Sequence, residues 1–220
     1  MQEIFRFLEA LRENNDRDWF HANKEWYLRI KAEHEAFINR VIAALVVVEP
    51  EVEGLEAKDC IFRIYRDTRF SPNKQPYKTH IGAYMVRGGK KSPRSGYYVH
   101  IEPGNCLLAG GVWCPEPSLL KALRQDVYDN IDEFTGIVRD KEFAKYYRLD
   151  GEKLKKVPAP FPKDFPEAEM LKFKAYTVTH GVPDAFFEGE DAVERVVDRL
   201  LLMKPFHRFL NYTVEETWNN

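Results

Sequence analysis

The stretch GYYVHIEPGNCLLAGGVW, residues 96–113, decides the fold. In its first part the apolar residues at 97, 99 and 101 alternate with Tyr98, His100 and Glu102. This period of two is typical of a β-strand with one face on a core and the other toward polar surroundings. Pro103-Gly104-Asn105 then form a tight-turn signal between two strand-like runs. Because parallel neighbours need a long crossover, a turn this short predicts antiparallel pairing.

Further alternation lies on both sides of this stretch. Residues 62–65 and 81–85 alternate before it, and residues 173–182 alternate after it. Each pattern indicates a strand. We therefore expect an antiparallel sheet formed by about residues 60–113, with one more strand near 173–182.

Helical spacing governs the rest of the chain. Apolar residues repeat every three or four positions in residues 1–50, with a turn signal before Asp16 and one continuous apolar side from Trp19 to Val48. The same spacing returns in 117–147 and in a final helix at 191–210. Four prolines in 157–168 predict an extended strap. Helices, then a sheet, then helices predict an α+β fold, as one domain over 1–220.

Composition narrows the class of protein. A chain of 220 residues with 44% hydrophobic and 31% charged residues is typical of a soluble globular domain. No uncharged apolar run approaches the roughly 20 residues that cross a membrane, and the first residues lack the features of a signal peptide. The three cysteines form no C-x-x-C pair, which favours free thiols in a reducing compartment. We expect a cytoplasmic protein with no membrane contact.

Positive charge is concentrated in one stretch. Between Arg63 and His100 there are nine basic residues and a single acid, Asp67, although the whole chain has a net charge of −2. Such a separation attracts anions, and arginine fits carboxylate or phosphate in two-point contacts. Two prolines, Pro72 and Pro76, stiffen the loop that carries these groups. We predict a ligand site formed by Arg63, Arg66, Arg69, Lys74, Tyr77, Lys78, Tyr98, His100 and Trp113.

Catalytic groups are harder to predict. His80 and His100 come from neighbouring strand-like segments, and Glu102 shares one strand face with His100, so that its carboxylate could orient the imidazole. His80, His100 and Asp67 are the candidates for acid–base chemistry. No phosphate-binding loop, H-E-x-x-H motif or G-x-S-x-G elbow is present, and no clustered carboxylates indicate a two-metal site. We predict no metal and no cofactor, and leave open whether the protein is an enzyme.

Several blocks carry a resemblance to a known family. NNDRDWFHANKEWY (14–27), FRIYRDTRFSPNKQPYKTHIGA (62–83), YYVHIEPG (97–104), LLAGGVWCPEP (107–117) and the later LKFK together resemble the conserved hypothetical proteins called domain of unknown function 2461. The resemblance implies a single soluble domain and assigns no activity. It places in the family's signature blocks Arg63, Arg66, Asp67, Arg69, Phe70, Lys74, Pro76, Tyr77, Lys78, His100, Gly111 and Trp113.

Three functions fit these observations. The preferred hypothesis is a pocket for a small ligand that bears phosphate or carboxylate. A nucleic-acid-binding module is the alternative, because aromatic residues are interleaved with the basic ones, although the pI of about 6.3 is low for such proteins. A protein–protein adaptor that docks an acidic partner is the third. The charges could also serve the structure alone, and the oligomeric state stays open.

Overall fold

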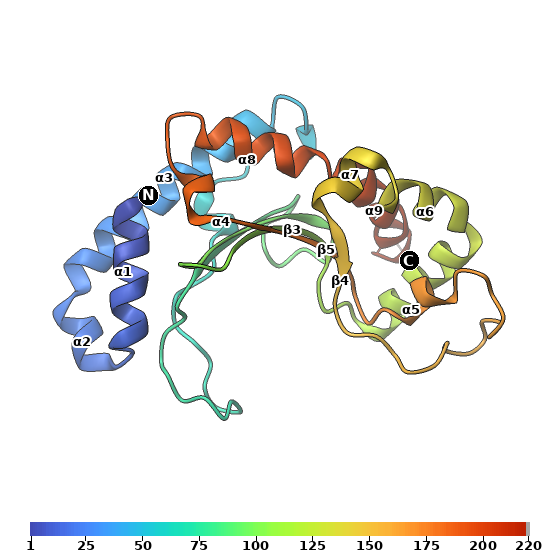
Figure 1. Cartoon of the computed structure of the whole chain (residues 1–220), viewed down its shortest axis with the longest axis horizontal. Coiled ribbons are helices and arrows are strands. Elements are labelled where there is room, and N and C mark those ends of the chain that lie inside the picture. Colours follow the sequence, from blue (N-terminus) through green and yellow to red (C-terminus); the bar gives the residue numbers. More distant parts are fainter. Residues whose placement is uncertain (219–220) are drawn as a thin grey trace. The chain divides into compact units, whose positions relative to one another are not determined.

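A computed structural model describes residues 1–218 and has an α+β fold. Five strands form one antiparallel sheet in the order β1-β2-β3-β5-β4 (Figure 1). Their bounds are Ile81–Met85 (β1), Gly96–Ile101 (β2), Cys106–Val112 (β3), Arg148–Asp150 (β4) and Tyr176–Val182 (β5). The expected antiparallel sheet and its strand near 173–182 are therefore confirmed.

The chain divides into two compact units. The first contains residues 1–90, 98–108 and 181–199, and the second contains residues 91–97, 109–180 and 200–220. Each unit holds part of the sheet together with its own helices. The expectation of one domain stays a prediction.

In the first unit, three helices cover the N-terminal residues: α1 (Gln2–Glu13), α2 (Arg17–Ala22) and α3 (Lys24–Leu45). The Asp16 side chain caps α2 by accepting a hydrogen bond from the Trp19 backbone, as its position predicted. The prediction of a single helix from Trp19 to Val48 is wrong, because the helix is interrupted at Asn23. The Asn23 amide donates to the Trp19 carbonyl, and its ψ of 21° turns the chain between α2 and α3.

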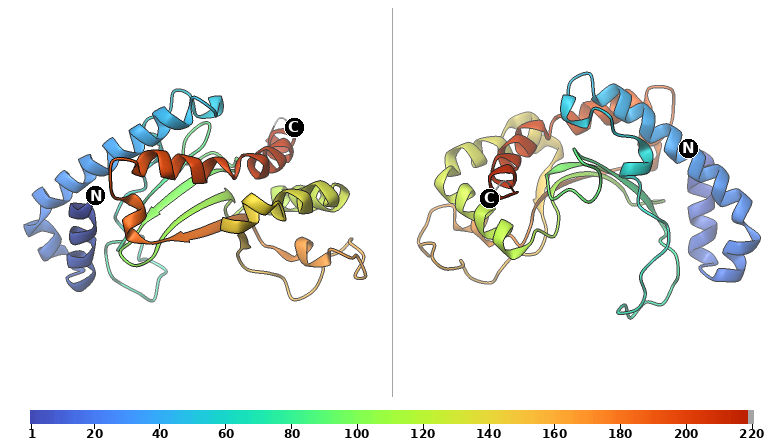
Figure 2. Two further views of the ribbon diagram at one scale, coloured as in Figure 1. Left: turned by 45° about the horizontal axis from the view of Figure 1, so that its top comes forward. Right: turned by 180° about the vertical axis from the view of Figure 1, so that it is seen from behind.

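Shorter elements complete this unit. They are η1 (Pro50–Val52), α4 (Ala57–Cys60), η3 (Asp184–Phe187) and α8 (Ala192–Leu201). Figure 2 shows α8 running beside α3. The core between the helices is apolar and aromatic: Phe7 of α1 is fully buried, and its ring lies 5.3 Å from that of Trp26.

The strand expected at 62–65 does not form. Within the described residues 1–218, the only pairings here are isolated bridges, Ile61 with Ala83 and Tyr65 with Tyr77. Pro72 and Pro76 lack the N–H that a regular ladder needs, so the segment between Tyr65 and Tyr77 cannot be an ordinary hairpin. In Figures 1 and 2 it forms a long projecting loop before the start of β1.

The second unit is built on helices α5 (Pro117–Asp129), α6 (Ile131–Val138), α7 (Lys141–Tyr146) and α9 (Lys204–Trp218). The fully buried Phe134 of α6 lies among the rings of Tyr176, Phe206 and Phe209. The final helix expected at 191–210 is in fact two helices, α8 and α9, with the break before Lys204. No helix within residues 1–218 has the length and apolar character to cross a membrane.

The proline-rich strap contains no helix or strand over 157–167, and the short helix η2 (Ala168–Lys172) follows it. The buried Arg124 of α5 anchors its end, because this guanidinium donates to the carbonyls of Leu171 (2.7 Å) and Phe173 (2.9 Å). These charge-assisted hydrogen bonds satisfy two backbone carbonyls of this segment.

Candidate functional site

The basic stretch folds back on itself and then joins β1. The Phe62 N–H donates to the carbonyl of Gly82 (3.0 Å), the Lys78 N–H to Ile64 (2.8 Å), and the Arg66 N–H to a proline carbonyl, that of residue 76 (2.9 Å). These hydrogen bonds fix the backbone positions of Arg66 and Lys78, from which their side chains extend.

A cleft lies between this segment and the N-terminal helices. Its volume is about 740 Å³. Both sides belong to the first unit. Its lining consists of Arg17, Asp18, Phe20, His21, Lys24, Tyr65, Arg66, Thr68, Pro76 and Tyr77.

Aromatic rings form the apolar part of this cleft. Phe20 stacks on Tyr77, with ring centroids 4.0 Å apart and planes 13° apart, and Tyr65 lies against both rings. Asn15 holds Tyr77 in place: its amide donates to the Tyr77 carbonyl and its side-chain oxygen accepts from the Tyr77 N–H, both at 3.1 Å. The wall is therefore fixed by backbone contacts as well as by ring packing.

Three cations and one acid line the same cleft. Arg17, Lys24 and Arg66 form no ion pair with a carboxylate anywhere in residues 1–218, and the acid is Asp18. The Lys24 ammonium lies 3.5 Å from the Tyr65 hydroxyl and over the Phe20 ring. The cleft is thus positive and partly aromatic.

Sequence reasoning predicted only Arg66 and Tyr77 of this lining. Arg17, Phe20 and Lys24 lie in the helical region that we interpreted as scaffold. The signal was available in the motif RDWFHANK, residues 17–24, because its cations Arg17 and Lys24 stand on either side of aromatic residues. Nothing local connects that motif to a loop more than forty residues later.

Several basic residues of the stretch have structural partners. Arg69 forms an ion pair with Asp67 at 2.6 Å, and Lys74 donates to the Thr68 carbonyl at 3.0 Å. Lys90 donates to the carbonyls of Lys58 and Asp59, and Arg94 pairs with Glu215.

Asp67 is a poor candidate for acid–base chemistry. Its hydrogen bonds from Arg69 lower the pKa of the carboxyl group to about 2. The carboxylate therefore stays ionised and committed to the loop.

Trp113, predicted as a pocket wall, is 75% exposed and belongs to the second unit. Arg63 is exposed, and no ion pair joins it to a carboxylate of residues 1–218. Its positive charge adds to the effect of burial in lowering the pKa of Lys78. The roles proposed for Arg63 and Trp113 in ligand binding stay predictions.

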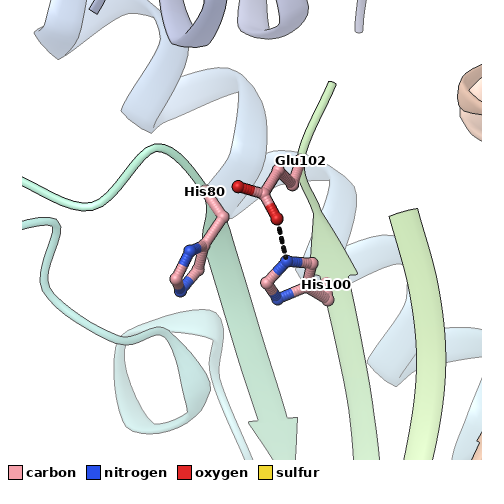
Figure 3. Close-up of side chains that lie close together, drawn as sticks. All are labelled: His80, His100 and Glu102. Atoms are coloured by element: carbon pink, nitrogen blue, oxygen red, sulfur yellow. Dashed lines mark hydrogen bonds and ion pairs between the residues drawn. The ribbon is translucent and has the colours of Figure 1, made fainter. Parts of the chain in front are cut away.

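A second cluster surrounds His80, which precedes β1, and His100 of β2 (Figure 3). The two imidazole centroids lie 4.4 Å apart. His100 Nε2 lies 3.3 Å from Glu102 Oε2, and His100 Nδ1 lies 3.0 Å from the Tyr98 hydroxyl. The expectation that Tyr98, His100 and Glu102 share one strand face is confirmed by these contacts.

Burial sets the charge of the two imidazoles. It lowers the pKa of His80 to about 4, and the nearby His100 and Lys78 act in the same direction. Burial also lowers the pKa of His100, although its hydrogen bond with Glu102 opposes this shift. Both rings are therefore neutral at neutral pH, which suits a proton acceptor or a metal ligand.

The charge of Glu102 is set by hydrogen bonds. Burial alone would raise the pKa of this carboxyl group, but hydrogen bonds from Asn105, His100 and Thr79 together outweigh it and lower the pKa. The nearby Lys78 has a pKa lowered first by burial and then by the positive charge of Arg63. The cluster thus contains one carboxylate with two neutral imidazoles.

The second unit contains a buried serine–histidine pair that sequence reasoning did not predict. Ser95 Oγ lies 2.6 Å from His207 Nδ1. The Asn211 side chain accepts a hydrogen bond from the Ser95 N–H and donates one to the Ser95 carbonyl. Both side chains of the pair are nearly inaccessible to solvent, and His207 Nε2 has no hydrogen-bond partner among residues 1–218. A nucleophile needs access to its substrate, so we interpret this pair as structural.

Comparison with known proteins identifies the family. The family model described as conserved hypothetical protein (DUF2461) matches residues 3–209, and the chain therefore belongs to that family. No curated protein and no solved structure matches the chain. The family has no assigned activity, so any function must be argued from the geometry above.

Proposed function

We propose that this protein binds a small ligand bearing phosphate or carboxylate, and that the ligand occupies the cleft between α2 and the loop after residue 65. The observation that carries the proposal is the excess of cations in that cleft. Arg17, Lys24 and Arg66 face one acid, Asp18, and none of the three forms an ion pair within the described residues 1–218. Cations that have no carboxylate partner are available to an anion from solution.

The shape of the cleft supports the same proposal. Its volume of about 740 Å³ lies within the range of roughly 300–1,000 Å³ that small-molecule sites have. The stacked rings of Phe20 and Tyr77 offer an apolar surface beside the cations. A ligand with an anionic group next to a ring or a hydrocarbon portion would use both features, with Arg66 contacting the anionic group.

A thermal-shift screen is the first test. The protein is heated in a buffer that contains a metal chelator, with one anion added at a time. The anions are inorganic phosphate, a nucleoside monophosphate, a hexose phosphate, succinate and citrate. We expect at least one of these anions to raise the melting temperature. Calorimetry then measures the affinity of that anion for Arg66→Ala and for Arg29→Ala. The latter is the matched control, since Arg29 is an exposed arginine of α3 outside the cleft lining.

The expected difference follows from the strength of charged hydrogen bonds. Losing such bonds at Arg66 costs about 1.5–3 kcal/mol, which corresponds to an affinity roughly 10- to 150-fold weaker. Arg29→Ala should bind as the wild type does. If no anion of the panel changes the melting temperature, or if both variants bind equally well, the cleft is not the site.

Single-stranded nucleic acid is the second candidate, because one observation favours it. Phe70 at the loop tip is 94% exposed, and the guanidinium of Arg69 lies 5.8 Å from its ring centroid. An exposed ring next to a cation is typical of surfaces on which bases stack. A fluorescent oligothymidine should then bind with an affinity that falls steeply with salt and is weaker for Phe70→Ala. Absence of binding at low salt would exclude this candidate.

A further inference from the structure

Three potential metal ligands meet where β1 begins and β2 ends (Figure 3). One donor atom from each of His80, His100 and Glu102 lies within 4.8 Å of the other two. β1 and β2 are antiparallel neighbours, so the residue before β1 lies beside the last residues of β2. Sheet pairing therefore brings together residues that are 20 positions apart in sequence.

We propose that His80, His100 and Glu102 bind one divalent transition-metal ion. Two imidazole nitrogens and one carboxylate oxygen are a donor set that suits zinc, iron(II) or manganese(II). Three protein ligands also leave coordination positions open, as in catalytic rather than structural metal sites. The sequence carries no recognisable motif for it, because His80 precedes β1 and His100 lies in β2.

The surroundings of the ligands support this proposal. In metal sites the ligands are held by further hydrogen bonds, which orient them toward the ion. Here Thr79 donates to Glu102 Oε1 at 2.9 Å, and Asn105 donates to Glu102 Oε2 at 2.7 Å. Tyr98 contacts His100 Nδ1, which leaves Nε2 on the side of the carboxylate.

Tyr98 itself depends on a glycine in the neighbouring strand. A Cβ atom at Gly82 would lie 2.6 Å from the Tyr98 hydroxyl, so only glycine lets this ring lie across β1. The glycine thus makes room for the group that orients His100.

His80 has an available ring nitrogen. No hydrogen bond to its ring is present within the described residues, and the side chain is only partly buried. His100 and Glu102 are also partly buried, with 12% and 18% of their side-chain surfaces exposed. All three side chains are therefore shielded in part from solvent and still accessible to an ion.

Positive charge near the cluster affects what the ion would bind. The positive charges of Lys78 and Arg66 both lower the pKa of His80. They weaken the attraction for a bare cation. They also make the open coordination positions suitable for an anionic ligand such as a carboxylate or phosphate.

Equilibrium dialysis against Co²⁺ and Zn²⁺ tests the site. The full-length protein is stripped of metal with a chelator and dialysed in a buffer free of phosphate and carboxylates, and bound metal is measured by elemental analysis. We expect one equivalent of either ion, with visible Co²⁺ absorption that Zn²⁺ abolishes. His80→Gln, His100→Ala and Glu102→Gln should lose the ion at concentrations that saturate the wild type.

Two further variants separate a metal site from a merely structural cluster. Asn105→Ala removes a group that holds Glu102 and should weaken metal binding by about 10- to 100-fold. His180→Ala, a histidine of the second unit, should bind as the wild type does. Melting curves show which variants fold. His80→Gln decides the outcome if His100→Ala unfolds, because His100 loses its contacts with Tyr98 and Glu102, whereas no hydrogen bond to the His80 ring is present within residues 1–218.

Two results would overturn the proposal. One is a wild-type protein that binds no stoichiometric metal, and the other is full metal binding by folded His80→Gln. The test is independent of the proposed anion cleft. Anion binding is measured in chelator with variants of Arg66, whereas metal binding is measured without anions and with variants of His80, so either can fail alone.

Discussion

A buried histidine should make the stability of this protein depend on mild acid. His34 lies on α3 with 2% of its surface exposed, and its Nε2 has no hydrogen-bond partner in the part of the chain that the structure describes. Burial lowers the pKa of this imidazole from 6.5 to about 3. The folded protein therefore keeps the ring neutral at a pH at which the unfolded chain would protonate it.

The sign and size of the effect follow from this difference in pKa. Below pH 6.5 the unfolded state binds a proton that the folded state does not, so the free energy of unfolding falls as the pH falls. The loss is about 1.4 kcal/mol per pH unit until the folded pKa is reached. Between neutral pH and about pH 5, His34 costs about 2 kcal/mol. His207, buried with a pKa also lowered to about 3, adds a similar amount.

His34→Leu tests this account, because leucine has a similar volume and no ionisable group. Urea denaturation at about pH 7.5 and about pH 5 should show a wild-type loss near 4 kcal/mol from these two histidines, and a loss smaller by about 2 kcal/mol in the variant. His80 and His100 add the same loss to both proteins and cancel in the comparison. His34 is the better position to change because His207 bonds to Ser95.

His21→Leu, at an exposed position of α2, is the control and should follow the wild type. The quantity compared is the difference between the two pH values, so any change in stability at neutral pH does not affect the conclusion. Equal acid sensitivity of wild type and His34→Leu would refute the reasoning. It would mean that the folded state protonates His34 as easily as the unfolded state does.

Two further predictions concern the backbone and the thiols. Gly111→Ala should destabilise the protein by more than about 3 kcal/mol, because φ is +126° and a Cβ would lie 2.1 Å from the Tyr176 carbonyl oxygen; Gly136→Ala, on α6 with open space around it, should be neutral or slightly stabilising, and equal effects in urea denaturation would contradict this. Burial raises the pKa of Cys60 and of Cys106 to about 12, whereas Cys114 is exposed. Ellman's reagent should therefore modify one thiol in the native protein and three after unfolding, and rapid reaction of all three in the native state would disprove it.

Local periodicity was enough to predict much of the fold. The alternation in 96–113 and the turn at Pro103-Gly104-Asn105 predicted β2, β3 and their antiparallel pairing, which the sheet confirms. It also placed Tyr98, His100 and Glu102 on one face. These inferences succeeded because side chains two residues apart on a strand point the same way, whatever the rest of the chain does.

The errors occurred where local patterns compete with other contacts. The apolar side that continues from Trp19 to Val48 indicated one helix, yet the Asn23 side chain bonds back to Trp19 and the helix breaks there. Residues 62–65 alternate as a strand would, but they exchange hydrogen bonds with their own loop and form only isolated bridges. Neither outcome can be read from the spacing of apolar residues.

The candidate sites depended on contacts between distant segments. Charge counting located the basic stretch, but it could not show that Arg69 is matched by Asp67 while Arg66 meets Arg17 and Lys24 across a cleft. The approach of His80 to Glu102 likewise arises from strand pairing. Periodicity reports which face of its own element a residue occupies. Which faces come together depends on packing over the whole chain, and an ionic or metal-binding site exists only once they have met.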